Sequence, residues 1–232
     1  IDLLRPHLFP GARILALTSD AAAPAAIATL LASGGFGASQ ITLLEAMGGP
    51  DERIRSSAAA SFAMEAINPL NTLAIAVEAE PGARILPRAA GLDDSLFETD
   101  GQITKREIRA LTLSALAPRP GEWLVDIGAG SGSVAIEWML ADRRCRATAV
   151  EPRTDRAARI RANAAAFGVP GLDVVEGAAP EALAAIESAD AVFVGGGLSR
   201  PGVLAAALAL VRPGGRLVAN AGTLETGRGL LS

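Results

Sequence analysis

Residues 125–137 read Val-Asp-Ile-Gly-Ala-Gly-Ser-Gly-Ser-Val-Ala-Ile-Glu. An apolar run ends at Asp126, and three alternating glycines follow before a stretch of small residues that is typical of a helix start. Glycine allows the backbone to turn sharply and to approach a ligand where any Cβ would collide. The pattern therefore predicts a strand, a ligand-binding loop and a helix. The predicted loop residues are Asp126, Gly128, Ala129, Gly130, Ser131 and Gly132.

The glycine spacing indicates which ligand the loop would bind. It is G-x-G-x-G, whereas a dinucleotide fold prefers G-x-G-x-x-G to place a pyrophosphate at the helix N-terminus. The next apolar run, Ala147 to Val150, ends in Glu151, nineteen residues after Gly132. An acid at that strand end can accept both ribose hydroxyls of an adenosine. These features favour S-adenosylmethionine as the cofactor and disfavour a nicotinamide enzyme.

Further strands are expected at Leu172–Glu176 and Asp190–Val194, with helices between them. The stretch Leu210–Val218 is expected to contain a helix end, a tight turn at Arg212–Arg216 and the fifth strand. Strands that alternate with helices build an open parallel sheet, and ligands bind at the carboxyl ends of its strands. We therefore predict an α/β fold, the Rossmann-like parallel sheet of class I S-adenosylmethionine methyltransferases. A tight turn without any ligand is the alternative explanation for the glycines.

Composition narrows the class of protein. The chain has 232 residues, half of them apolar, and a net charge of −4, which argues against a broad nucleic-acid surface. It contains no apolar run long enough to cross a membrane and no recognisable secretion signal, so we expect a cytoplasmic protein. The single cysteine, Cys145, excludes an internal disulfide, and we expect no metal site.

In the first part of the chain, predicted strands and helices also alternate. We expect strands at Arg13–Leu17, Ile41–Leu44 and Leu73–Val77, and helices at Ala23–Ala32 and Arg55–Ala66. Three strands and two helices are too few for an independent α/β domain, so this stretch is expected to be the back half of a larger one. The predicted boundaries are 1–80 for the partial domain, 81–101 for a linker and 102–232 for the methyltransferase domain. A surface loop within one domain is the alternative to the linker.

A helix is predicted after the linker. Thr104 and Glu107 have the spacing of a capping box, and Ile108, Leu111 and Ala115 fall on one face of the helix, which should end near Pro118. Lys105 in the first turn opposes the helix dipole, which would suit an anionic ligand, although an ordinary solvated lysine is the favoured explanation.

These residues resemble a known family. The run from Thr104 to Arg109, followed by Trp123 to Trp138, resembles the decarboxylating precorrin methyltransferases of cobalamin biosynthesis. Upstream, Leu17–Asp20, Leu43–Glu45 and Pro69–Asn71 resemble the closing half of the tetrapyrrole methylase domain that precedes the methyltransferase domain in the fused enzyme. The resemblance covers nearly the whole chain. It implies C-methylation of a precorrin by the second domain, at carbon 15, with decarboxylation of the ring C acetate.

The resemblance also implies which residues meet the cofactor. These are Thr104, Gly128 to Gly132, Glu151 and the turn Gly177-Ala178-Ala179. Many methylases of this fold place an aspartate for the adenine amine at that turn, whereas this chain has alanine. Adenine would then be held by backbone groups and apolar contact. A short connection without ligand contact is an equally good explanation of the turn.

Acid–base groups are scarce in the second domain. It has no histidine, the whole chain has no tyrosine, and His7 lies far away. Chemistry should therefore depend on positioning a carbon nucleophile and on the conjugated substrate as an electron sink. Gly195 to Gly197 would leave open space for a flat macrocycle. Lys105, Arg106 and Arg200 are the candidates for binding substrate carboxylates, before Arg156 and Arg159, which suit a solvated helix face.

The sequence leaves other functions open. A class I methyltransferase acting on RNA, protein or a small molecule is one alternative, and a cofactor-binding scaffold without turnover is another. We also expect the chain to be truncated at both ends, without the closing hairpin of the second domain. An exposed sheet edge invites pairing with another chain, and the resemblance implies a homo-oligomer, with a tetramer formed through the second domain.

Overall fold

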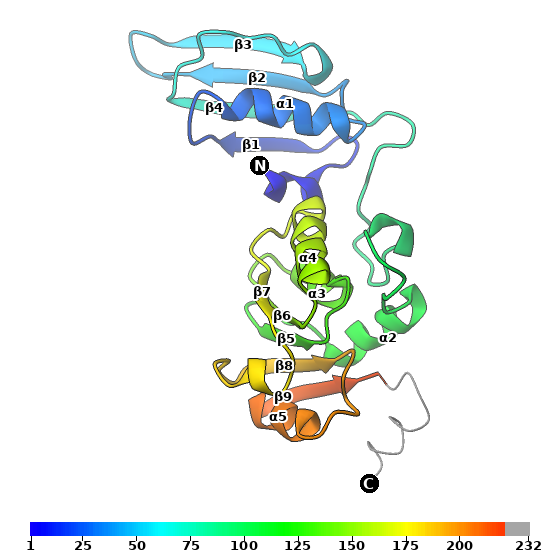
Figure 1. Ribbon diagram of the computed structural model, residues 1–232. Coiled ribbons are helices and arrows are strands. Elements are labelled where there is room, and N and C mark those ends of the chain that lie inside the picture. The colour runs from blue at the N-terminus through cyan, green and yellow to red at the C-terminus, as the bar shows by residue number, and fades with distance from the viewer. Residues whose placement is uncertain (221–232) are drawn as a thin grey trace. The chain divides into compact units, whose positions relative to one another are not determined.

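The computed structural model describes residues 1–220 and divides into two compact units (Figure 1). The first extends to Leu86 and the second begins at Pro87. Each contains its own sheet, of four strands in the first unit and five in the second. Residues 87–101 fall in the stretch predicted as a linker, yet they belong to the second unit, where Leu92 and Phe97 are buried.

The first unit is an antiparallel sheet with its core under a single α-helix. The strand order is β1-β4-β2-β3, and every pair is antiparallel. Leu31 of the helix packs in one cluster with Ile41, Leu43 and Leu73 of the sheet, all fully buried. The elements are β1 (Arg13–Leu17), α1 (Ala23–Ser33), β2 (Gln40–Glu45), β3 (Arg53–Ala58) and β4 (Asn71–Ala76).

The helix predicted at Arg55–Ala66 is wrong, because this region begins with strand β3 and continues as the short 3-10 helix Ala59–Ser61. The reason is a buried carboxylate on the neighbouring strand. Glu45 is fully buried and accepts hydrogen bonds from Arg53 Nε and Arg55 Nε, each at 2.9 Å. Arginines two residues apart share a face only in a strand, so this partner overrides the helix propensity of the alanine-rich sequence.

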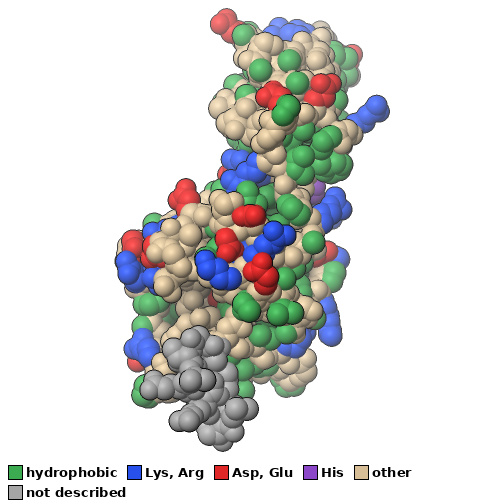
Figure 2. Space-filling view, turned by 90° about the vertical axis from the view of Figure 1, so that its right-hand side faces the viewer, with side chains coloured by type: hydrophobic (Ala, Val, Ile, Leu, Met, Phe, Trp, Pro, Cys, Tyr) green, Lys and Arg blue, Asp and Glu red, His purple; other side chains and the backbone are tan. Residues whose placement is uncertain are grey.

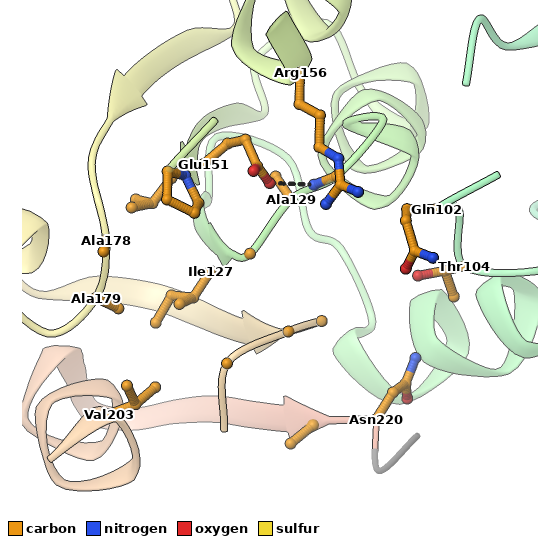
Figure 3. A pocket seen from close by; sticks show the side chains of 18 of the residues that line it. Gln102, Thr104, Ile127, Ala129, Glu151, Arg156, Ala178, Ala179, Val203 and Asn220 are labelled. Carbon is orange, nitrogen blue, oxygen red and sulfur yellow. Dashed lines mark hydrogen bonds between the residues drawn. The ribbon is translucent and has the colours of Figure 1, made fainter. Parts of the chain in front are cut away.

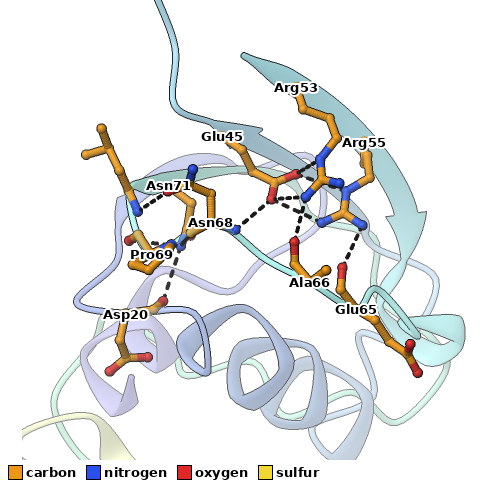
Figure 4. A network of polar contacts seen from close by, with 10 residues as sticks. Asp20, Glu45, Arg53, Arg55, Glu65, Ala66, Asn68, Pro69 and Asn71 are labelled. Carbon is orange, nitrogen blue, oxygen red and sulfur yellow. Dashed lines mark hydrogen bonds and ion pairs between the residues drawn. The ribbon is translucent and has the colours of Figure 1, made fainter. Parts of the chain in front are cut away.

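Figure 4 shows this network, in which Glu45 also accepts from the backbone N–H of Asn68 at 2.9 Å. The Arg53 hydrogen bonds, followed by those from Asn68 and Arg55, outweigh burial and lower the pKa of Glu45 to about 2. The two guanidinium groups donate in turn to the carbonyls of Ala66 and Glu65. One ionised carboxylate thus connects β2, β3 and the loop before β4.

The second unit is the predicted open parallel sheet, with strand order β7-β6-β5-β8-β9, and this prediction is confirmed. The order reverses between β5 and β8, so right-handed crossovers place α3 and α4 on one face and α5 on the other. The elements are α2 (Arg106–Leu116), β5 (Trp123–Ile127), α3 (Ser133–Ala141), β6 (Arg146–Glu151), α4 (Thr154–Phe167), β7 (Asp173–Glu176), β8 (Ala189–Val194), α5 (Val203–Leu210) and β9 (Val211–Ala219). The closing hairpin that we expect to be missing concerns residues 221–232, which lie outside the described residues.

Helix α2 differs from the prediction at its start and in its buried face. It begins at Arg106, and its cap residue, Lys105, makes no side-chain capping bond, so the predicted capping box is wrong. The face with Ile108 and Leu111 is exposed. The helix instead buries Arg109 and the residues that follow it at helical spacing, Thr112, Leu113 and Leu116. A fully buried arginine is invisible to a search for apolar periodicity.

Candidate functional site

A pocket of about 680 Å³ opens at the carboxyl ends of the parallel strands (Figure 3). It lies at the point where the strand order reverses, the usual ligand position in open α/β sheets, and its size is in the range of small-molecule sites. The loops after β5, β6, β7 and β8 form it, together with the segment before α2. Its lining residues include Gln102, Ile103, Thr104, Lys105, Ile108, Ile127, Gly128, Ala129, Gly130, Glu151, Arg156, Gly177, Ala178, Ala179, Gly195, Gly196, Gly197, Arg200 and Asn220.

The glycine loop has the left-handed backbone that its sequence predicts, with φ of +70° at Gly128, +61° at Gly130 and +75° at Gly132. A Cβ at Gly128 would lie 2.8 Å from the backbone of Gly196 in the loop after β8. A Cβ at Gly132 would meet the Ile160 side chain at 2.8 Å. Gly128 and Gly130 line the pocket. Gly132 instead allows the start of α3 to pack closely against Ile160 of α4.

Glu151 ends β6 beside this loop. Its side chain accepts a hydrogen bond from the backbone N–H of Gly130 at 2.9 Å and one from that of Arg153 at 3.2 Å. A carboxylate offers about four acceptor positions, so two of them remain for hydroxyl groups in the pocket. The arrangement can bind a vicinal diol next to the glycine loop.

Asp126 does not line the pocket. It is buried behind the loop, where Oδ2 accepts from the backbone N–H of Ala135 at 3.3 Å, and Oδ1 has no hydrogen-bond partner within residues 1–220. Burial, and to a smaller extent the nearby Glu151 carboxylate, raises the pKa of Asp126 to about 7. Ser131 is likewise buried and outside the pocket lining.

We expect Asp126→Asn to stabilise the second unit above neutral pH. In the unfolded chain the Asp126 carboxyl loses its proton near pH 4, whereas in the folded chain, where its pKa is raised, it loses it only near pH 7. The contribution of Asp126 to stability therefore falls as the pH rises from 4 through 7. The loss is on the order of 4 kcal/mol. Trp123 and Trp138, the two tryptophans of the chain, both lie in this unit. Denaturant unfolding followed by their fluorescence should give similar stabilities at pH 4 and a more stable variant at pH 8. A difference that does not change between pH 4 and 8 would contradict this prediction.

Two of the three predicted carboxylate-binding cations line the pocket. Lys105 and Arg200 do, the former with a 3.8 Å ion pair to Asp94. Arg106 does not, and it lies 3.9 Å from Asp93 on the surface. Figure 2 shows acidic and basic side chains intermixed on one face of the second unit. The side chains of Arg106 and Asp93 are 58% and 60% exposed, so Arg106 belongs to a solvated pair of charges and not to the pocket.

Comparison with known proteins decides the family. A family model described as a precorrin methyltransferase domain matches residues 95–232. The precorrin-6Y C(5,15)-methyltransferase (decarboxylating) of a Sinorhizobium species is 61% identical over 97% of this chain and 54% of its own length. The chain belongs to the precorrin methyltransferase family. It spans about half the length of the first curated relatives that it matches.

Two further matches concern a shorter stretch. A probable cobalt-precorrin-6B C(15)-methyltransferase (decarboxylating) of Saccharolobus solfataricus is 37% identical over 148 residues, 61% of this chain and 74% of its own. The crystal structure of the C-terminal domain of precorrin-6Y C5,15-methyltransferase from Rhodobacter capsulatus has a TM-score of 0.59 and 47% identity. That match covers 63% of this chain and 78% of that one.

Sequence reasoning for this family member missed several pocket residues. Arg156 was expected on a solvated helix face, yet it lines the pocket, whereas its neighbour Arg159 does not. Gln102 lies over the glycine loop, where a Cβ at Gly130 would be 3.2 Å from its carbonyl oxygen. Asn220 enters from the end of β9 and donates to Thr112 Oγ1 at 3.1 Å. The sequence could have indicated these residues only by their position. Each of them lies close in the chain to the end of a predicted strand or in the segment before α2, which lies over those strand ends.

Within residues 1–220, no group of three or more His, Cys, Asp or Glu side chains could hold a metal ion. No helix in this part of the chain is long and apolar enough to cross a membrane.

Proposed function

We propose that the chain carries out S-adenosylmethionine-dependent C-methylation of a precorrin, and that its second unit methylates carbon 15 and decarboxylates the ring C acetate. The names of the relatives support this assignment. The Saccharolobus relative, a carbon-15 enzyme by name, matches over 148 residues, which exceeds the length of the first unit and is close to that of the second. The Rhodobacter structure is likewise a C-terminal domain.

The observation that carries the proposal is the juxtaposition of Glu151 with the glycine loop at the reversal point of the sheet. The residues present fit S-adenosylmethionine. The free acceptor positions of Glu151 suit the ribose hydroxyls, and Gly128 and Gly130 allow close approach of the ligand. Ala178 and Ala179 offer small apolar contacts for adenine on the other side of Glu151, as Figure 3 shows. When bound, the cofactor supplies an electrophilic methyl group on a sulfonium.

The remaining chain groups would position the substrate. Lys105 and Arg200 bring positive charge to the pocket, which suits the acetate and propionate carboxylates of a tetrapyrrole. A Cβ at Gly197 would meet no atom within 4 Å, so this edge leaves room for a flat ring. The described lining contains no histidine, cysteine or tyrosine. The protein would therefore orient the nucleophilic carbon in line with the methyl group and exclude water, while the conjugated substrate accepts electrons during decarboxylation.

Calorimetric titration of the 232-residue chain with S-adenosylhomocysteine tests the cofactor. We expect micromolar binding, weakened about tenfold or more by Glu151→Ala because hydrogen bonds to an ionised group are lost. Glu151→Gln, which keeps the side-chain shape and one acceptor oxygen, should fall between the two. Tryptophan fluorescence on heating checks that each variant is folded. Equal affinity of wild type and Glu151→Ala would contradict the proposed cofactor site.

Turnover separates this function from its alternatives. Methyl transfer to a reduced precorrin, with release of carbon dioxide, would support the proposal. Cofactor binding without transfer would favour the scaffold, and transfer to RNA or protein would favour another class I methyltransferase. We assign the first unit to the closing half of a tetrapyrrole methylase domain by resemblance, and this assignment stays a prediction. The homo-oligomer and the cytoplasmic location stay predictions.

A further inference from the structure

Arg156 points into the pocket but is not used by the function described above. It lies in the first turn of α4, and Figure 3 shows its side chain directed into the pocket. Its Nε donates to Asp100 Oδ2 at 2.9 Å, and its side chain is 20% exposed. Within residues 1–220, the terminal nitrogens Nη1 and Nη2 donate no hydrogen bond. The guanidinium is thus held at one nitrogen and free at two.

The neighbours of Arg156 place it over the glycine loop. Asp100, its partner, is two residues before Gln102, whose carbonyl oxygen lies over Gly130. Glu151, which binds the Gly130 N–H, ends the strand that leads into α4. Of the three cations in the described part of the pocket lining, Lys105 belongs to the segment before α2 and Arg200 to the loop after β8. Arg156 is the one next to Glu151 and the loop.

Arg156 shares its carboxylate partner with a second arginine of α4. Arg156 and Arg159 share a single carboxylate oxygen, Asp100 Oδ2, at 2.9 and 3.6 Å. Arg153, on the same helix turn, is paired with Asp155 at 2.9 Å. Asp100 therefore pairs with both guanidinium groups, and of the two arginines only Arg156 lines the pocket.

We infer that Arg156 binds the α-carboxylate of the amino-acid part of the cofactor. The inference rests on the proposed function, in which Glu151 holds the ribose. Figure 3 shows Ala178 and Ala179 on one side of Glu151, and Gln102 and Thr104 on the other. With adenine at the alanines, the amino-acid end extends toward Gln102, where Nη1 and Nη2 offer the two-pronged donor geometry that a carboxylate accepts.

Two ligands that differ only at this end test the assignment. S-adenosylhomocysteine carries the α-carboxylate, whereas 5′-methylthioadenosine ends at the thioether and lacks the whole amino-acid part. In calorimetric titrations of the 232-residue chain, Arg156→Ala should weaken S-adenosylhomocysteine binding by about 10- to 100-fold, as expected for lost hydrogen bonds to a charged group. Methylthioadenosine binding should change by less than about twofold, the usual range for a substitution that touches nothing of the ligand.

The matched control is Arg159→Ala, which removes a guanidinium from the same Asp100 but not from the pocket lining. Both ligands should bind it as they bind the wild type. Asp100→Ala removes the tether of Arg156 and should weaken S-adenosylhomocysteine less than Arg156→Ala does. Thermal unfolding followed by tryptophan fluorescence confirms that each variant is folded.

The outcomes are separable. Equal weakening of both ligands by Arg156→Ala, reproduced by Asp100→Ala, would show that Arg156 only anchors the segment before α2 and would overturn the assignment. No effect of Arg156→Ala on S-adenosylhomocysteine would also overturn it. If Glu151→Ala still weakens both ligands in that case, the proposed function stands without Arg156. A wild-type chain that binds neither ligand would overturn the proposed function and this assignment together.

Discussion

Replacing Gly128 by alanine is expected to destabilise the second unit by between about 2 and 5 kcal/mol and to abolish cofactor binding. Its left-handed backbone, with φ of +70°, disfavours any side chain. In addition, the new Cβ would lie 2.8 Å from both N and O of Gly196, which are backbone atoms that cannot rotate away. The loops after β5 and β8 would have to separate, and both of them line the pocket. Denaturant unfolding by tryptophan fluorescence and titration with S-adenosylhomocysteine measure the two effects.

Gly197→Ala is the matched control for this prediction. Gly197 lines the same pocket with φ of +79°, but a Cβ there would meet nothing within 4 Å. It should cost only the left-handed strain, roughly 1–2 kcal/mol. If the two variants lose equal stability, the contact between Gly128 and Gly196 contributes nothing beyond backbone strain, and our account of the loop contact is wrong.

The fold of the second unit was predictable because its signals are local. A parallel strand buried on both faces is a short apolar run, and the turns between strand and helix are marked by Gly128, Gly130 and Gly132. The acid at the end of the next strand, Glu151, follows from the same register. These features depend on residues close together in the chain, which periodicity and turn chemistry describe well.

The sequence-based predictions of secondary structure are wrong where a partner distant in the chain determines the local structure. Strand β3 forms because Glu45 on β2 binds Arg53 and Arg55, and nothing within the alanine-rich run 58–66 signals that partner. Helix α2 buries a charged residue, Arg109, because the carboxylates of Glu137 on α3 and of Asp94 accept hydrogen bonds from it. Pairing of buried charges is a tertiary property, so patterns of apolar residues mislead where it occurs.

In the candidate site, too, the residues that follow local patterns were predicted correctly, and those whose placement depends on distant partners were not. The predicted pocket residues at strand ends, including Glu151 and Ala178, do line the pocket. Asp126 does not, because it precedes the turn and its carboxylate lies toward the N-terminus of α3, where it accepts from Ala135. Arg156 was assigned to solvent because helix periodicity cannot show that the first turn of α4 lies over the glycine loop. The segment around Asp100, brought there by the fold, determines its direction.

Replacing Arg109 by methionine is expected to cost the second unit about 3–5 kcal/mol, the usual result of breaking a buried ion pair from one side. Arg109 is fully buried, with Nε 2.5 Å from Glu137 Oε1 and Nη1 3.0 Å from Asp94 Oδ1. Its remaining donors reach the carbonyls of Thr104 and Leu92. Without it, Glu137 keeps only the backbone N–H groups of Gly91 and Leu92, and an uncompensated charge stays buried. Unfolding followed by tryptophan fluorescence measures the loss.

A double-mutant cycle with Glu137→Gln tests this cause. Glutamine is neutral and can still accept from one of the two backbone N–H groups, so it removes the stranded charge that makes Arg109→Met costly. The double variant should therefore lose less stability than the sum of the single losses, by about 1–3 kcal/mol of coupling. Thr104 lines the pocket and its carbonyl is bound by Arg109, so both Arg109 variants should also bind S-adenosylhomocysteine more weakly. Additive losses would mean that Arg109 stabilises the unit through its packing against Phe97, 4.8 Å from the guanidinium, and not through the buried charge of Glu137.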